Sequence, residues 1–417
     1  MIVGAGACGL VAALTLKDAG VDCVVLERDA LPSGSTALSS GFIPACGTRW
    51  QKALGVKDSA AQYSAEIRNK NRDGANFAIV DAAVNEIGAT LEWLADAHGI
   101  PFQVLEGFLY PGHGVARMHA VPEKTGAGLM GRLLSAAQKA QVDLLMNALV
   151  VDVQFNKVTI KRPDNSREDI ACDAVLLACN GFGGNREMVR RYIPEIADAE
   201  YAGHAGNQGD AVRWGLALGA QLADMGAYQG HGAWAVPHGK LLTWALMTEG
   251  GIQLNALGKR FADEAQGYSE ASQSVLAQPG RSAWSLYDER LHRLGLTFPD
   301  YVELHAAGAV RMAVNVEALA GNTGLPVKAL RQEMQKFKPP YYAVKVTGAL
   351  FHTQGGLEID ASAQVLDTQG RPLPNLYAAG GAARGLSGAH VWGYLSGNGL
   401  LSAVALGRIA GRSLVSK

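Results

Sequence analysis

The sequence predicts a mixed α/β fold built around a parallel sheet. Hydrophobic residues make up 48% of the 417 residues, which is ample for a buried core. Glycine is in excess at 51 residues and has no collagen-like period, which indicates many tight turns and close backbone approaches. A short apolar run at the N-terminus leads into closely spaced glycines and a helix-like segment. At roughly 150 residues per domain, we expect two or three domains.

The first thirty residues predict a β-α-β unit. The apolar run Met1–Val3 predicts a first strand, although three residues is short. Leu10–Ala19 carries apolar residues at helical spacing, and Gly20 predicts the end of that helix. Asp22–Leu26 predicts a second strand, which ends at Glu27.

The glycines between the first strand and the helix have the spacing of a dinucleotide-binding turn. Gly4 allows the tight turn, Gly6 lets the backbone reach a pyrophosphate, and Gly9 lets helix and strand pack closely. The helix N-terminus then offers N–H groups and a positive dipole end to phosphates. Glu27 lies 18 residues beyond Gly9, near the ~20 expected for a carboxylate that binds a ribose hydroxyl. These features together predict a Rossmann-like domain.

Small-residue and glycine-rich segments recur along the rest of the chain. In order they are Ser33–Gly41, Val175–Gly184, Gly250–Glu264, His352–Leu357, Pro374–Gly380, Gly397–Asn398 and Gly407–Gly411. In composition and order they resemble the flavoprotein family of fumarate reductase, succinate dehydrogenase and 3-ketosteroid dehydrogenases. In that family a loop like Ser33–Gly41 runs along FAD toward the isoalloxazine ring. The resemblance therefore implies FAD as the cofactor.

The resemblance also implies an architecture, a discontinuous Rossmann-like FAD-binding domain with an inserted α+β cap domain. We expect the FAD-binding domain to comprise residues 1–225 and 346–417, with the cap at 226–345. The cap would close over the flavin ring.

Several elements are predicted from local patterns. Val150–Ile160 and Ile170–Cys179, separated by a turn near Arg162–Ser166, predict a hairpin that feeds a sheet strand. A helix is expected over Ala211–Gly219, directly after Gly209-Asp210. The helices expected in the cap are Ala309–Leu319 and Pro326–Lys336.

The glycine turn and the resemblance together imply a set of FAD contacts. They are Gly4, Gly6, Ala7, Gly9, Glu27, Arg28, Ser35, Thr36, Ser40, Gly41, Val150, Ala178, Asn180, Gly181, Asn185, Asp210, Gly380, Asn398 and Leu400. Gly381 departs from the family, which commonly has an acidic residue at this position that contacts the ribityl chain.

The family's substrate-binding histidines are retained here, but its arginines are not. His231, in Tyr-Gln-Gly-His, and His352, in His-Thr, match the two histidines. The position of the family's proton-donating arginine is Tyr268, and that of its carboxylate-clamping arginine is Tyr394. The acid and arginine that support the proton donor likewise align with Trp244 and Met247.

The replacement of arginine by tyrosine changes the substrate that the site suits. Arginine binds a carboxylate through two parallel charge-assisted hydrogen bonds, which a phenol cannot replace. A tyrosine O–H suits a carbonyl oxygen that gains enolate charge, and a tyrosinate can remove an α-proton. Tyrosines do this work in the ketosteroid Δ1-dehydrogenases, which the site resembles.

We therefore predict an FAD-dependent enzyme that introduces, or reduces, a C=C bond α,β to a carbonyl group, with hydride exchanged with flavin N5. Either Tyr268 or Tyr394 is the expected base, and His352 and Tyr110 are expected to contact the carbonyl or the substrate. His231 completes the predicted catalytic set.

Two alternatives stay open. The first is an ene-reductase or dehydrogenase of a carboxylate, resembling the fumarate, urocanate or tricarballylate enzymes, with Arg281, Arg311 or Arg117 supplying the positive charge. The second is a non-catalytic flavin-binding electron-carrier subunit, against which the retained histidines argue. The segment Tyr110–Gly114, with Arg117 and His119 after it, is either a loop near the substrate or a proline–glycine surface turn.

Composition and charge indicate which classes of binding partner the protein lacks. With 37 basic and 38 acidic residues the net charge is −1, and no basic stripe indicates a nucleic-acid partner. No apolar run approaches the ~18 residues of a membrane span, and no secretory signal is visible. The five cysteines form no Cys-x-x-Cys pair, so we expect no metal site and no disulfide framework. We expect a soluble cytoplasmic protein with a small-molecule substrate; the sequence leaves its electron acceptor unknown.

Overall fold

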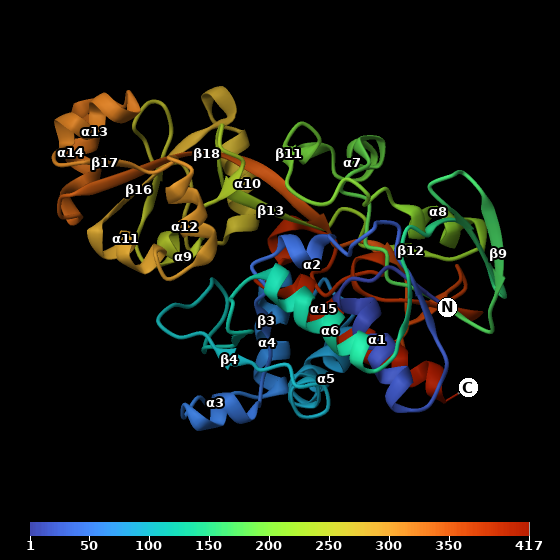
Figure 1. Ribbon diagram of the computed structural model, residues 1–417. Coiled ribbons are helices and arrows are strands. Elements are labelled where there is room, and N and C mark those ends of the chain that lie inside the picture. The colour runs from blue at the N-terminus through green and yellow to red at the C-terminus, as the bar shows by residue number, and fades with distance from the viewer. Residues whose placement is uncertain (417) are drawn as a thin grey trace.

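The structure, a computed structural model, describes residues 1–416 and has two lobes joined by a long strand (Figure 1). The larger lobe contains a six-stranded sheet in the order β20-β21-β10-β1-β2-β6, parallel except for β20. The bounds are β1 Ile2–Val3, β2 Val24–Leu26, β6 Asp143–Leu145, β10 Val175–Leu177, β20 Gln364–Leu366 and β21 Pro372–Ala378. The predicted α/β class and the parallel sheet are confirmed.

The predicted β-α-β unit is present at the N-terminus. Strands β1 and β2 are parallel neighbours, with Ile2 opposite Val25, and helix α1, Ala7–Asp18, connects them. The helix begins three residues before the predicted start because its N-cap is Gly6. Helix α15, Asn398–Val415, packs along α1, so the two ends of the chain complete one lobe (Figure 1).

The remaining elements of the larger lobe surround this sheet. Its other helices are α2 Ser35–Leu38, α3 Arg49–Ala53, α4 Ala60–Asn71, α5 Phe77–Asp96, α6 Gly126–Lys139, α7 Arg186–Tyr192 and α8 Asp210–Ala217. Its small strands are β3 Ile43–Pro44, β4 Gln103–Val104, β5 Met118–Ala120, β12 Leu222–Ala223 and β19 Gly356–Leu357. Helix α8 confirms the helix expected after Gly209.

The region predicted as one hairpin is a three-stranded antiparallel sheet followed by a core strand. Its strands are β7 Leu149–Gln154, β8 Lys157–Lys161 and β9 Arg167–Ala171. The single strand predicted over Val150–Ile160 is wrong, because the chain turns at Phe155 and Asn156 and pairs with itself. The turn near Arg162–Ser166 is confirmed, with Arg162 N–H donating to Ser166 O at 2.9 Å. A break between β9 and β10 also divides the strand predicted over Ile170–Cys179.

The smaller lobe is built on an antiparallel sheet in the order β14-β13-β18-β16-β15, with β11 and β17 also paired to β18. The strands are β11 Glu200–Tyr201, β13 Tyr228–Ala235, β14 Lys240–Leu241, β15 Ile252–Leu254, β16 Ala283–Asp288, β17 Arg311–Ala313 and β18 Tyr341–Thr353. The helices are α9 Ala245–Thr248, α10 Tyr268–Leu276, α11 Glu289–Gly295, α12 Pro299–Ala306, α13 Val316–Thr323 and α14 Val327–Glu333.

One helix predicted in this lobe is wrong and the other is confirmed. The first half of the predicted helix Ala309–Leu319 contains strand β17 instead, whose Arg311 pairs with Ala343 of β18. The helix starts only after Asn315, whose side chain accepts a hydrogen bond from Ala318 N–H and caps α13. The predicted helix Pro326–Lys336 corresponds to α14 and the 3-10 turn that follows it.

The predicted domain division stays a prediction, and the packing of the core supports it. The largest cluster of buried apolar side chains fills the larger lobe, and the second fills mainly the smaller lobe, which corresponds to the predicted cap. Strand β18 crosses the predicted boundary at 345/346 and runs from one lobe into the other (Figure 1). The two lobes are therefore joined by one continuous strand.

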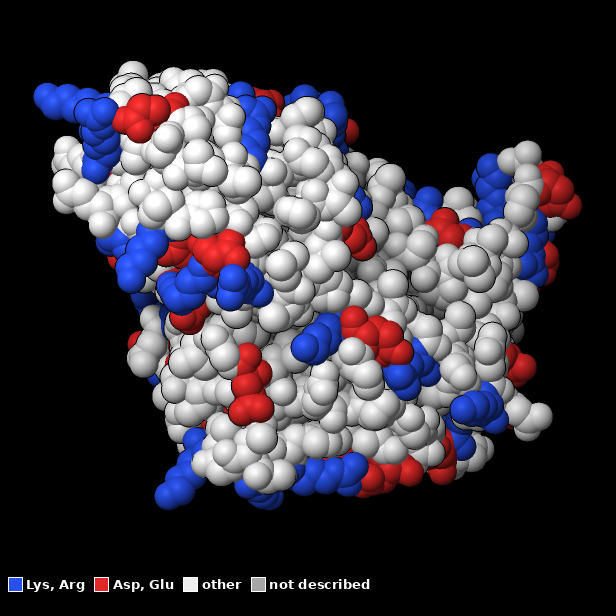
Figure 2. All heavy atoms as spheres, turned by 60° about the vertical axis from the view of Figure 1, so that its left-hand side comes forward, with Lys and Arg blue, Asp and Glu red and all other residues white. Residues whose placement is uncertain are grey.

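The charged side chains on the surface are of mixed sign. Figure 2 shows acidic and basic side chains interspersed on the face in view, without a large patch of one sign. Among residues 1–416, no helix combines the length and the apolar character required to cross a membrane. Over the same residues, no group of three His, Cys, Asp or Glu side chains is arranged to hold a metal ion.

Candidate active site

A long cavity runs between the larger lobe and the smaller lobe, the predicted cap. All five predicted catalytic residues line it, together with most of the predicted FAD contacts. The predicted FAD contacts outside its lining are Gly9, Gly181, Asn185 and Asn398. One end is formed by the glycine turn and β2, and the other by aromatic residues of the cap and the loop before α15.

The glycine turn is shaped by two close backbone approaches. Gly4 has φ +106°, and a Cβ there would lie 2.6 Å from Ala178 O. A Cβ on Gly9 would lie 2.0 Å from Gly4 O, so Gly9 allows α1 to pack against the turn, as predicted. Helix α1 begins without a side-chain cap and without an acidic residue in its first turn. Its N-terminus therefore suits a phosphate anion.

The expected ribose carboxylate is fixed by the backbone. Glu27 is 8% exposed, and its two oxygens accept hydrogen bonds from Ala5 N–H at 3.0 Å and Asp29 N–H at 3.1 Å. A carboxylate has about four acceptor positions, so it can still receive ribose hydroxyls. Arg28 donates to Gly206 O at 2.7 Å, and His204 lies 3.1 Å from the Asp29 carboxylate. No motif in the sequence predicted a role for His204.

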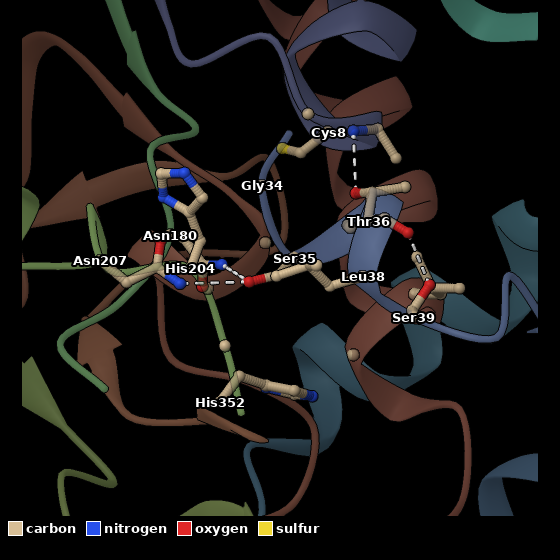
Figure 3. A pocket seen from close by; sticks show the side chains of 18 of the residues that line it. Cys8, Gly34, Ser35, Thr36, Leu38, Ser39, Asn180, His204, Asn207 and His352 are labelled. Atoms are coloured by element: carbon tan, nitrogen blue, oxygen red, sulfur yellow. Dashed lines mark hydrogen bonds between the residues drawn. The ribbon is translucent and has the colours of Figure 1, made fainter. Parts of the chain in front are cut away.

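The small-residue loop is held between the glycine turn and a pair of amides. Figure 3 shows the Ser35 hydroxyl facing the amide groups of Asn180 and Asn207, which donate to it at 2.5 and 3.1 Å. The Thr36 hydroxyl accepts from Ala7 N–H at 3.2 Å, which ties the loop to the start of α1. Ser40 donates to Asp300 of the cap at 2.6 Å, so its hydroxyl joins the two lobes.

The predicted FAD contacts outside the lining have structural partners. A Cβ on Gly181 would lie 2.0 Å from the Thr353 Oγ1. Asn185 caps α7 by accepting from Glu187 and Met188 N–H, and Asn398 is buried and donates to Ser387 Oγ at 3.2 Å. These contacts give each residue a packing role.

The cap end of the cavity is an aromatic cage around Tyr268. The ring of His231 stacks on that of Tyr268, with centroids 4.8 Å apart and planes at 20°. Tyr110 and Tyr394 lie 6.1 and 6.0 Å away by the same measure, and Trp244 at 6.5 Å. Strand β13 supplies His231, α10 begins at Tyr268, and the segment before α15 supplies Tyr394. Residues far apart in sequence thus form one wall.

The two predicted bases differ in their hydrogen bonds. Burial raises the pKa of Tyr268 to about 12, and hydrogen bonds with the Ser396 and Tyr394 side chains and the Gly397 backbone counteract this rise. Burial raises the pKa of Tyr394 further above its ordinary value, and its hydrogen bond to Tyr268 adds to that rise. Because the pKa of Tyr394 is raised further, Tyr268 ionises first, and its phenolate can then accept from the Tyr394 hydroxyl, which makes Tyr268 the better base.

Both histidines are neutral hydrogen-bond donors. His231 Nδ1 accepts from Ala233 N–H at 3.1 Å, so its proton is on Nε2. His352 Nδ1 lies 2.9 Å from Gln354 Nε2 and 3.3 Å from Thr353 O. The Gln354 amide oxygen receives the Ser387 hydroxyl at 3.0 Å, so Gln354 is the donor in the shorter contact and the His352 proton is on Nε2. Burial lowers the pKa of His231 to about 3 and that of His352 to about 4. Each ring thus offers an Nε2–H without a positive charge.

Positive charge is absent from the aromatic end. Among the described residues that line the cavity, Arg28 is the only lysine or arginine. The three arginines considered for a carboxylate substrate lie outside the lining. Arg281 and Arg311 are exposed on the cap, the latter with its guanidinium 4.9 Å from the Trp284 ring centroid. Arg117 is fully buried elsewhere.

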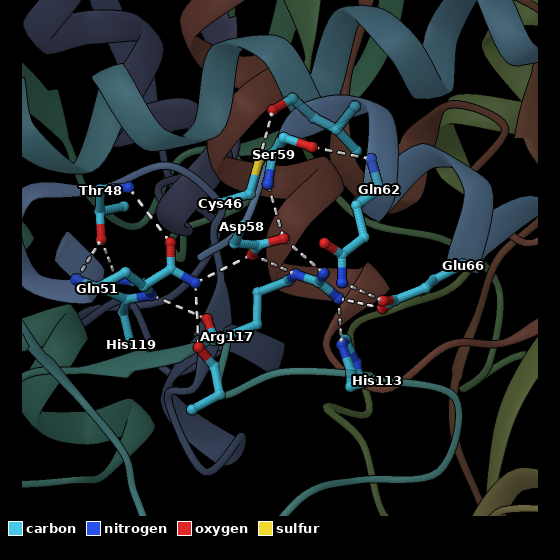
Figure 4. A network of polar contacts seen from close by, with 12 residues as sticks. Cys46, Thr48, Gln51, Asp58, Ser59, Gln62, Glu66, His113, Arg117 and His119 are labelled. Atoms are coloured by element: carbon cyan, nitrogen blue, oxygen red, sulfur yellow. Dashed lines mark hydrogen bonds and ion pairs between the residues drawn. The ribbon is translucent and has the colours of Figure 1, made fainter. Parts of the chain in front are cut away.

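Arg117 is the centre of a buried ion-pair network (Figure 4). Its guanidinium donates to both oxygens of Asp58 at 2.8 Å, pairs with Glu66 and covers the ring of Tyr63 at 4.2 Å. His113 lies on its other side, 3.0 Å away. The sequence left open whether Tyr110–Gly114 and the residues after it lie near the substrate. Tyr110 lines the cavity, whereas His113, Arg117 and His119 are buried outside its lining.

Replacing Arg117 by methionine is expected to lower the free energy of unfolding by about 3–5 kcal/mol, because the Asp58 and Glu66 carboxylates lose their partner. Urea denaturation of the variant measures this. The matched control is Arg132→Met, which breaks an exposed ion pair with Glu123 and should cost at most ~1 kcal/mol. Equal losses in the two variants would contradict the assignment.

Comparison with known proteins identifies the family. Residues 1–400 match the family described as FAD binding domain. The chain belongs to this family. FAD is accordingly its cofactor, as predicted, and the glycine turn, the uncapped α1 and Glu27 supply the features that a dinucleotide requires.

This FAD-binding protein is similar to several characterised flavoproteins. A probable fumarate reductase of Shewanella frigidimarina is 27% identical over 99% of this chain and 74% of its own. The open conformation of a flavocytochrome c3 fumarate reductase superposes with a TM-score of 0.84 at 27% identity, covering all of this chain and 77% of that one. A 3-ketosteroid-Δ4-(5α)-dehydrogenase of Rhodococcus jostii RHA1 gives 0.77 at 25% identity, covering all of this chain and 96% of that one. The predicted enzyme class, an FAD-dependent oxidoreductase acting on CH–CH bonds, agrees with this family.

Proposed function

We propose that this flavoprotein interconverts a CH–CH bond and a C=C bond α,β to the carbonyl group of an uncharged substrate. The observation that carries the proposal is the composition of the aromatic end of the cavity. Three tyrosines, a tryptophan and two neutral histidines surround the space, and the lysines and arginines of the described residues lie elsewhere. A dianion there would lack the charge that compensates its desolvation.

The residues divide into oxygen binders and a base. Bound FAD supplies the two-electron hydride acceptor or donor. The Nε2–H groups of His231 and His352 can donate to a carbonyl oxygen and stabilise the charge that develops as the enolate forms. The Tyr110 phenol, whose ring centroid lies 6.1 Å from that of Tyr268, completes the substrate contacts.

Tyr268 is the proposed base for the α-proton. The Tyr394 and Ser396 hydroxyls and the Gly397 backbone favour its ionised form, so the phenolate has donors at hand when it forms. Tyr394 acts through Tyr268 by donating its proton to the phenolate oxygen.

A carboxylate substrate is the second candidate. The similarity of this chain to a probable fumarate reductase and to a flavocytochrome c3 fumarate reductase favours it. In this chain, however, the clamp and proton-donor positions carry Tyr394 and Tyr268, and Arg117, Arg281 and Arg311 lie outside the cavity lining. The neutral-carbonyl substrate therefore accounts for more of the site.

The cysteines bear on the cellular location of the protein. The five cysteines are free thiols, which suits a reducing compartment and supports the cytoplasm as the location. Burial raises the pKa of Cys8, beside the glycine turn, to about 12, so it stays a thiol and not a nucleophile. We propose that a separate small molecule or protein exchanges electrons with the flavin.

Matched ligand pairs test the substrate class. The purified holoenzyme is titrated with a cyclic methyl ketone and with the carboxylate of the same ring, and the change in the flavin absorbance gives each dissociation constant. We expect the ketone to bind at least tenfold more tightly, because an uncompensated charge must be desolvated in this cage. Tighter binding of the carboxylate would contradict the proposal.

The rate of desaturation should rise with pH. Because burial raises the pKa of Tyr268 to about 12, only a small fraction is phenolate at neutral pH, and that fraction grows about tenfold per pH unit below 12. In the reductive direction Tyr268 acts as an acid, and the rate should be flat over the same range. Stopped-flow measurement of flavin reduction between pH 7 and 10 distinguishes the two. A desaturation rate that falls with rising pH would exclude a phenolate base.

A further inference from the structure

The segment Tyr394–Gly397 joins the cavity to the buried network around Arg117. Tyr394, Ser396 and Gly397 line the cavity beside Tyr268. On its other side, the Ser396 carbonyl oxygen lies 2.9 Å from His113 Nε2. The two loops also meet directly, because a Cβ on Gly112 would lie 2.7 Å from Leu395 Cδ1. His113 thus makes a polar contact between the network and the segment Tyr394–Gly397.

The network fixes the direction of this hydrogen bond. Arg117 Nη1 lies 3.0 Å from His113 Nδ1, and a guanidinium can only donate. His113 Nδ1 therefore accepts, its proton is on Nε2, and Nε2 donates to Ser396 O. Arg117 is held in turn by Asp58 and Glu66, so its orientation is set from behind (Figure 4). Burial lowers the pKa of His113 to about 4, which keeps the ring in this neutral form.

The Ser396 carbonyl and the Gly397 N–H belong to the same peptide group. A hydrogen bond donated to the oxygen of a peptide polarises it and makes its N–H a stronger donor. Gly397 and Tyr268 both line the cavity, and the Gly397 backbone is among the groups that favour the ionised Tyr268 oxygen. A line of polar groups therefore runs from Arg117 through His113 and this peptide toward the Tyr268 oxygen.

We propose that His113, held by Arg117, is a positioning residue that orients and polarises the Ser396–Gly397 peptide so that it supports negative charge on the Tyr268 oxygen. The inference rests on the proposed role of Tyr268 as base. It assigns a purpose to a buried charged network that does not line the cavity.

Other titratable groups also face Tyr268, and they stay constant when His113 changes. His231 stacks on its ring from β13, and Tyr110 and Tyr394 face it from two loops. On its own helix Glu270 is paired with Lys70 of α4. If the pH dependence of the rate changes when only His113 is replaced, the change therefore acts through the contact of His113 with the Ser396–Gly397 peptide.

Replacement of His113 by phenylalanine and by glutamine tests the inference, each in the wild-type and the Tyr268→Phe background. The rate of flavin reduction by a cyclic ketone is measured against pH under anaerobic conditions. We expect His113→Phe to lower the rate about tenfold and to move the rising limb of the profile about one pH unit higher. Glutamine, whose amide can still donate to Ser396 O, should restore most of the rate. In the Tyr268→Phe background His113→Phe should have no further effect.

The control is His119→Phe, which removes an equally buried histidine of the same network that bonds Thr48 and the Arg117 carbonyl but not Ser396. It is expected to lower the melting temperature and leave the pH profile in place. An unshifted profile in His113→Phe, or an equal loss in the Tyr268→Phe background, would overturn the inference. If Tyr268→Phe alone retains the full rate, it is the proposed base that fails. Should His113→Phe not fold, His113→Asn, too short to reach Ser396, gives the same readings.

Discussion

Replacing Tyr268 by phenylalanine is expected to lower the rate constant of substrate-dependent flavin reduction by roughly 10²–10⁴-fold, the usual contribution of a general base. The ring is kept, so the stacking on His231 and the packing against Trp244 persist. Only the oxygen that receives the α-proton is lost. FAD should stay bound, because the contacts predicted for it lie along the rest of the cavity. Anaerobic stopped-flow absorbance measures the rate, and the flavin-to-protein absorbance ratio measures the FAD content.

The matched control is Tyr287→Phe. Tyr287 is a fully buried tyrosine of the cap whose hydroxyl bonds that of Tyr301 at 2.8 Å, outside the cavity lining. This variant should lose about 1 kcal/mol of stability and retain the wild-type rate. If Tyr268→Phe and Tyr287→Phe reduce the flavin equally fast, Tyr268 is not the base.

Replacing Gly9 by alanine is expected to abolish FAD binding and to yield colourless protein. The added Cβ would lie 2.0 Å from Gly4 O and 3.2 Å from the Ile2 side chain. Both neighbours belong to the strand and turn that form the phosphate end, so α1 must move away and the phosphate-binding turn opens. Gel filtration followed by absorbance measurement of the bound flavin tests this result.

The matched control is Gly131→Ala, the same substitution at a position where the added Cβ causes no clash. Gly131 lies exposed in helix α6, and a Cβ there meets nothing within 4 Å. Because alanine favours the helix, this variant should bind FAD normally and gain up to about 1 kcal/mol of stability. Normal flavin content in Gly9→Ala would contradict the close packing of the glycine turn.

The sequence predicted the FAD-binding half of the fold best, because its signals are local. The run from Gly4 to Gly9 and the acid at Glu27 follow one another along the chain, and α1 and β2 form where expected. The cap was predicted less well. Residues 311–313 look helical in isolation, but β18 offers them a hydrogen-bonding edge, and this tertiary contact decides their structure.

The candidate site shows the same contrast. All five predicted catalytic residues line the cavity, since family position fixes which residues face it. What the sequence could not predict are partners brought from other segments. Ser396 joins Tyr268, Asn207 joins Ser35, and His113 reaches Ser396 across 283 positions of sequence. No spacing rule predicts such contacts, because they depend on how the loops pack.

The most direct test of the central claim is an anaerobic reduction experiment on the oxidised holoenzyme. One sample is mixed with a panel of saturated cyclic ketones and another with succinate and related dicarboxylates, and the flavin absorbance is followed. An uncharged cage with a phenolic base predicts that ketones bleach the flavin and dicarboxylates do not. Bleaching by dicarboxylates alone would contradict the account.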